Sequence, residues 1–449
     1  LNLKLFSFLS SSRVDSRHKV HKDHYRELNN KLKDKINADP GKKENVAEWL
    51  EKFLQGYHGA GANRTWCAQT FFPITKGLIT QEAIWNKSIA KKMPPSNWVD
   101  SVENLAKYYS ISKHRFLARG GELLYLQLCN LFSTNSSIIG ESFSQFDFNS
   151  DETDLPTLHQ SLHQGFGSLN KENTAAFDNL VNFIDSLDRK TQELTNRFED
   201  GLRCEWCPSE SWPEAYLFAV EINRLLKANL DPVERLELLM TGCALQVLRS
   251  LCAQSVRYTD ENRHERGGIL GYAWLFSHPN MPTRQQRLAS QRNIQVIQAL
   301  IQQALRNKEL VANAARHPKK NKEQLYREAD NRYGHKLFLS LGKKLGIISP
   351  YTGPGARFVM TDKLLRFLIT AILPPGKRCT YDEFLHRLYL HYGIAVEGEA
   401  LISSLLWSEL PGNSSLQSTK DSWFAEMLRA GGFLVELSDA CSIVRNTFY

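Results

Sequence analysis

The chain has 449 residues, of which 42% are hydrophobic and 23% are charged, and its net charge is +8. This length predicts roughly two to four domains, and the composition is typical of a soluble globular protein. No apolar run reaches the length of about 18 residues that a membrane-spanning helix needs, and no signal peptide is evident. Eight scattered cysteines indicate reduced thiols rather than a disulfide framework, so we expect a cytoplasmic protein without a membrane partner.

The first 140 residues are predicted to form a helical amino-terminal domain. They alternate charged helical segments with breaks such as Pro40-Gly41. The next stretch, residues 133–170, is rich in Ser, Asn, Asp and Gln and has few large apolar side chains. That composition predicts a linker or a long loop. We therefore expect a domain covering 1–140, followed by a central domain covering 141–320.

The central domain is predicted to be helical as well. One helix is expected near Ser211, with Pro213 in its first turn, and another after Asp231, which can cap the helix that Pro232 opens. A further helix is expected over about 283–308. The pair Cys204 and Cys207 has the C-x-x-C spacing of zinc ligands, but no second pair follows at short range. Ordinary reduced cysteines are the preferred interpretation, with a zinc site as the alternative, and no cofactor is predicted.

Charge is distributed unevenly along this central part. Residues 141–240 hold 8 Lys and Arg against 19 Asp and Glu, a net charge of −11, whereas residues 241–345 hold 18 against 7, a net charge of +11. A basic block of this size fits a polyanionic partner. The alternative is that the two blocks face each other inside one protein or are simply solvated.

The last part, residues 321–449, carries one pattern twice. A helix is followed by two short strands around a turn, first over about 335–359 and again over about 423–445. Thr380 and Glu383 have the spacing of a capping box at the start of a helix between the two units. This order predicts a tandem winged-helix region, so the fold class expected is mainly α with multi-helical amino-terminal and central regions and an α+β carboxy-terminal region.

The two predicted recognition faces differ in charge. The first helix buries Leu337, Phe338, Leu341 and Leu345, which leaves lysines on its other face, and Tyr351 lies near the hairpin tip. Lys and Arg on an exposed helix supply phosphate contacts. The predicted nucleic-acid-binding residues are Arg332, Lys336, Lys343, Lys344 and Arg357, with Arg284, Arg287 and Arg292 of the basic helix before them. The second unit exposes Asp421, Glu426, Glu436 and Asp439, which repel phosphate, so we expect it to contact proteins.

Several stretches share one overall texture: NRTWCAQTFFPI, RFLARGGELLYLQL, RYGHKLFLSLGKKLGIISP, TYDEFLHRLYLHYGIAVEG and WFAEMLRAGGFLVELSDACSIVRNTF. In them the chain resembles accessory, non-catalytic proteins of bacterial anti-phage DNA-modification and restriction systems, which are encoded beside ATPases and methylation or phosphorothioation genes. The resemblance implies a cytoplasmic subunit working in a larger defence complex, with an ATPase or a methyltransferase among its partners. The resemblance assigns a defined function to no residue of this sequence.

Together these features favour a non-catalytic nucleic-acid-binding or scaffold subunit of such a complex. It would dock on DNA through the first winged helix and on partner proteins through its acidic region and the terminal winged helix. Two alternatives stay open. One is a transcription regulator that binds DNA as a dimer, and the other is a nuclease with a metal site that the sequence does not reveal.

Overall fold

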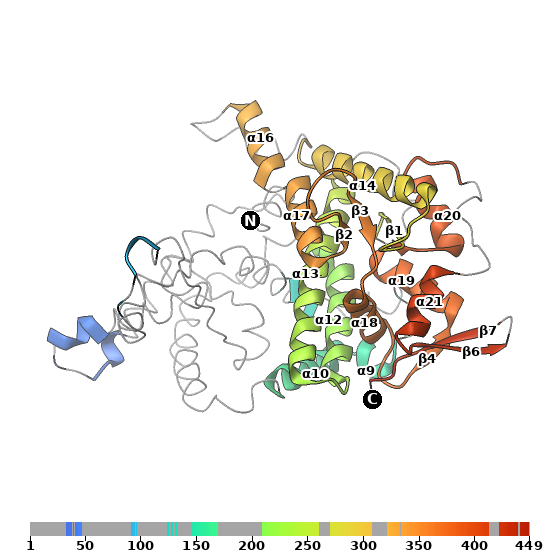
Figure 1. Cartoon of the computed structure of the whole chain (residues 1–449). Helices are drawn as coiled ribbons and strands as arrows, with labels where there is room; N and C mark the ends of the chain where they lie inside the picture. Colours follow the sequence, from blue (N-terminus) through green and yellow to red (C-terminus); the bar gives the residue numbers. More distant parts are fainter. Residues whose placement is uncertain are drawn as a thin grey trace.

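The computed structural model describes residues 148–168, 209–259, 270–307, 321–332, 334–412, 422–438 and 441–448, with short pieces and single positions before residue 148. Helices make up 64% of what is described, and the small strands lie in the carboxy-terminal part (Figure 1). The predicted mainly α fold class is therefore confirmed. Most of the predicted domain 1–140, and the pair Cys204 and Cys207, lie outside the described residues.

The helices, including one short 3₁₀ helix (η2), are α9 (Ser150–Thr153), α10 (Leu155–Ser168), η2 (Ser209–Ser211), α12 (Trp212–Lys227), α13 (Pro232–Arg257), α14 (Arg284–Ala304), α16 (Lys322–Arg332), α17 (His335–Leu345), α18 (Asp362–Ile372), α19 (Tyr381–Tyr392), α20 (Gly398–Trp407) and α21 (Trp423–Ala430). The strands are β1 (Trp274–Ser277), β2 (Ile348–Ser349), β3 (Arg357–Val359), β4 (Arg378–Thr380), β5 (Ile394–Ala395), β6 (Leu434–Ser438) and β7 (Cys441–Arg445).

Helix starts follow the capping residues that the sequence offers. The Asp231 carboxylate accepts hydrogen bonds from the backbone N–H groups of Val233 and Glu234 at the start of α13, as predicted. Thr283 and Gln286 form a reciprocal capping box at the start of α14. Each cap satisfies backbone donors that have no partner within the helix.

The prediction of a linker over 133–170 is wrong for its second half. Residues 150–168 form α9 and α10. Leu155, Leu158 and Leu162 lie on one face of α10 and are buried in the main core. Three apolar side chains at helical spacing suffice to anchor a helix whose other residues are polar, and the polar composition concealed this stripe.

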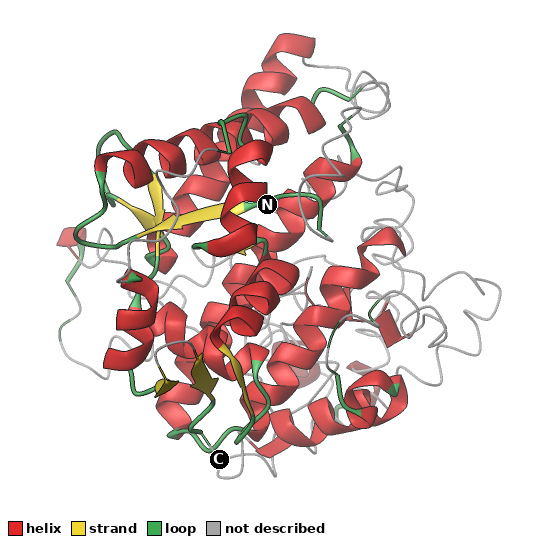
Figure 2. Ribbon diagram, turned by 90° about the vertical axis from the view of Figure 1, so that its right-hand side faces the viewer, coloured by secondary structure: helices red, strands yellow, loops and turns green. Residues whose placement is uncertain are grey.

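Two small sheets lie in the carboxy-terminal half (Figure 2). The first has the strand order β2-β3-β1-β5, with β1 parallel to both β3 and β5 and with β2 and β3 forming an antiparallel hairpin. The second is fully antiparallel and has the order β4-β7-β6. The central strand β1 was not expected from the sequence, because four buried residues in a row show no alternation of apolar and polar positions.

Helix α14 covers the first sheet, and polar side chains fix it there. The buried Asn293 amide accepts a hydrogen bond from the Leu275 N–H at 3.0 Å and donates one to the Ala273 carbonyl at 3.0 Å. The buried Ser290 hydroxyl accepts a hydrogen bond from the Phe358 N–H at 2.8 Å. These bonds satisfy strand groups that would otherwise be buried without a partner, so they set the position of α14 over β1 and β3.

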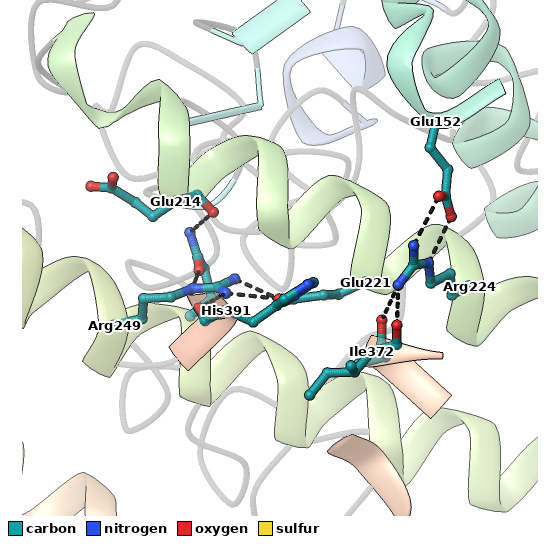
Figure 3. Close-up of polar contacts among 9 residues, drawn as sticks. Glu152, Glu214, Glu221, Arg224, Arg249, Ile372 and His391 are labelled. Atoms are coloured by element: carbon teal, nitrogen blue, oxygen red, sulfur yellow. Dashed lines mark hydrogen bonds and ion pairs between the residues drawn. The ribbon is translucent and has the colours of Figure 1, made fainter. Parts of the chain in front are cut away.

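A buried ionic network joins α12 and α13 to the carboxy-terminal helices (Figure 3). The fully buried guanidinium of Arg249 donates to both carboxylate oxygens of Glu221, each at 2.8 Å, and to the carbonyl of His391 at 2.9 Å. Nearby, Arg224 pairs with Glu152 and donates to the carbonyl of Ile372. Charges at this depth need such partners, because desolvation of an ion is costly.

The same helices tie the predicted central and carboxy-terminal domains into one hydrophobic core. Helix α18 packs on both α12 and α13. Within the described part of the chain, α13 is also the helix that is long and apolar enough to cross a membrane, and 76% of its apolar stretch is buried inside the protein. That burial accounts for its composition. The predicted boundary between 320 and 321 stays a prediction.

Candidate nucleic-acid interface

Helix α17 divides its residues between a buried face and a basic face. Leu337, Phe338 and Leu341 are buried, as predicted, whereas the fourth predicted residue, Leu345, is only partly buried. Gly342 allows close approach to β2, since a Cβ there would lie 2.5 Å from Cδ1 of Ile348. Lys336, Ser340 and Lys344 on the opposite face are exposed, and Lys343 is partly exposed. The tight packing of Gly342 against β2 brings the hairpin that follows next to these lysines.

The loop between β2 and β3, residues 350–356, forms the other side of the site. Its Tyr351 is 66% exposed and lines the same hollow as the lysines of α17. Gly353 and Gly355 take positive φ angles of 89° and 85°, which favour glycine and let the loop turn. The Gln291 amide of α14 donates to the Gly355 carbonyl at 3.3 Å. The loop is thus held between α17 and α14.

Helix α14 adds two exposed arginines in its first turn, Arg284 and Arg287, and Arg287 lies close enough to Arg357, which follows the loop, to lower its pKa. Cations are unfavourable at a helix N-terminus, where the helix dipole is positive. In the described part of the chain, neither arginine forms an ion pair, and the same is true of Lys343 and Lys344. A bound anion would relieve this concentration of positive charge.

The remaining predicted residues have other roles or no described side chain. Arg357 donates to the Ser277 hydroxyl and the His278 carbonyl, each at 2.9 Å, and to the Pro279 carbonyl at 2.6 Å, so it fixes the loop before α14. Burial, together with the charge of Arg287, lowers the pKa of Arg357. Arg292 forms an ion pair with Glu409. Arg332 ends α16, and its side chain is not described.

The structure therefore brings Lys336, Lys343 and Lys344 together with Tyr351 around one hollow, with Arg287 near Arg357 at the end of the loop. Arg284 is exposed in the first turn of α14, and Arg357 and Arg292 have partners within the protein. Tyr351 was expected near this site from the sequence, whereas Ser340, Leu339 and Gln291 were not. The neighbourhood of Gln291 depends on how α14 lies over the sheet, which no local pattern encodes.

Among the described residues, no group of three His, Cys, Asp or Glu side chains could hold a metal ion. Buried Cys252 and partly buried Cys243 have raised thiol pKa values, mainly because burial disfavours the thiolate. Comparison of the chain with protein-family models, with curated proteins and with solved structures finds no match.

Part of the acidic block pairs inside the protein. Glu221 binds Arg249, and Glu214 binds Arg257 through two hydrogen bonds of 2.7 Å, which joins the acidic segment 141–240 to the basic segment 241–345. Internal pairing was one of the alternatives that the sequence left open. These four charges of α12 and α13 are thereby paired within the protein, whereas Lys336 and Lys344 of α17 and Arg284 and Arg287 of α14 stay exposed.

Proposed function

We propose that this chain is a non-catalytic nucleic-acid-binding subunit of a multi-protein bacterial anti-phage defence complex. It docks on DNA through the basic surface formed by α17, the 350–356 loop and the first turn of α14. The observation that carries the proposal is the convergence of Lys336, Lys343 and Lys344 with Tyr351 and with Arg287 around one loop. Exposed cations on a helix and an adjacent hairpin are suited to phosphate contacts.

Within the same proposal, the terminal unit is a winged helix used for protein contacts. Its elements run α18, β4, α19, α21, β6 and β7, with β5 and α20 inserted, and its sheet order is β4-β7-β6. Order and pairing of this kind support a winged helix. The first unit departs from it, because β1 joins its hairpin in parallel.

Two features favour proteins over nucleic acid as the partner of the terminal unit. Its helix α21 exposes the acidic side chain of Glu426. Leu437 on β6 is 62% exposed. We assign partner contacts to this unit and to exposed acids of the acidic region, such as Asp151 and Glu210. The defence complex itself is proposed from the sequence resemblance, and co-purification of an ATPase or a methyltransferase with the tagged chain from its native host tests it.

A salt titration of the purified protein with fluorescent duplex DNA, with and without Mg²⁺, tests the nucleic-acid surface. We expect intact DNA and a linear fall of the logarithm of affinity with the logarithm of salt concentration. The variant Lys343→Glu/Lys344→Glu removes two phosphate contacts, so its slope should be shallower by about 1.8.

The matched control is Lys377→Glu/Arg378→Glu, the same charge change on exposed residues at β4, far from α17 in Figure 1. It should retain the wild-type slope. Equal slopes for the two variants would remove α17 from the proposal, and cleavage of DNA that depends on Mg²⁺ would replace it with the nuclease alternative. Protection of a short palindrome by a dimer would favour the transcription regulator.

A further inference from the structure

The basic face of α17 is one wall of a hollow rather than a protruding ridge. The hollow has a volume of about 330 Å³ and is lined by Lys336, Leu339, Ser340, Lys343, Lys344 and Tyr351. This is near the lower end of the range of about 300–1,000 Å³ found for small-molecule sites. The space therefore fits a unit of about the size of one nucleotide.

The shape of the hollow favours a single-stranded over a double-stranded nucleic acid. A recognition helix reads duplex DNA by entering the major groove, which is about 12 Å wide, so the helix must project beyond its surroundings. Here Tyr351, which follows β2, stands across from the lysines of α17 and makes the surface concave. An unpaired strand can enter such a hollow, whereas the backbone of a duplex can only lie across its rim.

The chemistry of the lining agrees with the shape. Bidentate contacts to base edges in a duplex come from Arg, Asn and Gln side chains, and from Lys at guanine. The hollow holds no Arg, Asn or Gln, and its hydroxyls are those of Ser340 and Tyr351. It offers ammonium groups for phosphates and, in Tyr351 and Leu339, apolar surfaces for the face of a base. An aromatic ring beside a row of cations is the arrangement by which proteins bind single strands without sequence preference.

The spacing of the lysines suits a strand that runs along the helix. Lys336 and Lys344 are eight residues apart, which corresponds to about 12 Å along the axis of α17. Lys343 and Lys344 lie at the end of the helix nearest the hairpin, because β2 begins at Ile348. Phosphates on either side of one base can thus meet cations at both ends of the hollow.

We infer that the hollow between α17 and Tyr351 binds an unpaired nucleotide of a single-stranded nucleic acid. The base stacks on the Tyr351 ring, and the flanking phosphates contact Lys336, Lys343 and Lys344. This inference rests on the proposed function and narrows it to the class of nucleic acid recognised. A duplex would then be held through its backbone alone, less tightly than a strand of the same length.

Fluorescence anisotropy with three labelled probes tests the inference: a 20-nucleotide oligo-dT, a 20-nucleotide oligo-rU and a blunt 20-base-pair duplex, all at one salt concentration. The full chain should bind a single strand more tightly than the duplex. The Tyr351→Leu variant should lose about tenfold in affinity for the strand, because base stacking on an aromatic ring is replaced by a weaker contact. Its affinity for the duplex should not change. The control Tyr351→Phe retains the ring and should bind as the wild type does.

The outcomes separate this inference from the function on which it rests. Tighter binding of a single strand than of the duplex supports the inference, whichever of oligo-dT and oligo-rU is preferred. Tighter binding of the duplex, with no effect of Tyr351→Leu on any probe, overturns the inference and leaves the proposed function intact. Absence of binding to all three probes at low salt overturns both.

Discussion

The fully buried carboxylate of Glu221 offers the most direct test of how the core is held together. Replacing it with glutamine retains its shape but removes the negative charge that faces Arg249. The guanidinium of Arg249, 0% exposed, would retain its bonds to the His391 carbonyl and to Gln246, but it would have no counter-charge. Removing one partner of a buried ion pair costs about 3–5 kcal/mol. Domains have total stabilities of about 5–15 kcal/mol, so Glu221→Gln should lose a large fraction of the folding free energy.

Urea denaturation followed by circular dichroism measures this loss as a lower midpoint at an unchanged slope. The control Glu210→Gln removes the same charge from an exposed position and should stay within about 0.5 kcal/mol of the wild type. The double variant Glu221→Leu/Arg249→Met removes both charges and should recover much of the stability, since apolar replacements of buried ion pairs are often tolerated. A free energy of unfolding for Glu221→Gln within about 1 kcal/mol of the wild-type value would refute the reasoning, because burying a guanidinium without a counter-charge should cost more than that.

Two further predictions concern the same core. Gly242→Ala should destabilise the protein by about 1–3 kcal/mol despite the better helix propensity of alanine, because the added Cβ would lie 2.7 Å from the buried Phe367 ring. Thermal melts measure this loss against the control Gly41→Ala, whose Cβ would meet nothing within 4 Å. Burial lowers the pKa of His391 below 6.5 although its hydrogen bond to Glu221 opposes this shift, so the unfolded chain binds the proton first and stability falls as the pH drops below 6.5. The variant His391→Asn should be less stable than the wild type at pH 7 and should lose less stability than the wild type between about pH 7 and 5.5, as urea midpoints at each pH would show. An equal loss in the variant and the wild type would mean that groups other than His391 cause the pH dependence.

At lower pH, the protonation of Glu221 also reduces the stability of the folded protein. Burial alone would raise its pKa, but the charge of Arg249 and the hydrogen bond with His391 bring the pKa of Glu221 below 4.5. A carboxyl group with a lowered pKa contributes stability that is present above 4.5 and is lost as the pH falls through its folded-state value. Acid therefore weakens this network at both of its titrating members.

Local sequence signals predicted much of the helical structure. The caps at Asp231 and Thr380, and the buried stripe of Leu337, Phe338 and Leu341, depend on neighbours within one helical turn, and the structure contains them. Only half of the predicted capping box at Thr380 forms. Its hydroxyl accepts from the Glu383 N–H, whereas the Glu383 carboxylate pairs with Arg387. A side chain with two nearby partners takes the one that the tertiary surroundings favour.

Long-range pairing could not be predicted in this way. The register of β1 against β3 places Phe276 opposite Phe358, residues from segments between which α14, α16 and α17 lie in the sequence. Four buried residues in β1 fit a strand or a piece of buried helix equally well. The same limit applied to the basic surface. Its lysines were predicted from one helix, but the position of Tyr351 and of the α14 arginines depends on how β3 and α14 meet.

The charge split of the sequence has a consequence for where anions can bind. Glu214 and Glu221 neutralise Arg257 and Arg249 within the protein, so these four charges of α12 and α13 contribute little field at the surface. The cations of α14 and α17 have no such carboxylate partners among the described residues, except for Arg292 with Glu409, and Arg306 just after α14 pairs with Asp330. Around the 350–356 loop, Lys343, Lys344 and Arg287 therefore keep charges that no carboxylate among the described residues neutralises. A site defined in this way should lose affinity sharply when two of its lysines are reversed, and it should respond little to the same change on β4, which is the contrast that the salt titration measures.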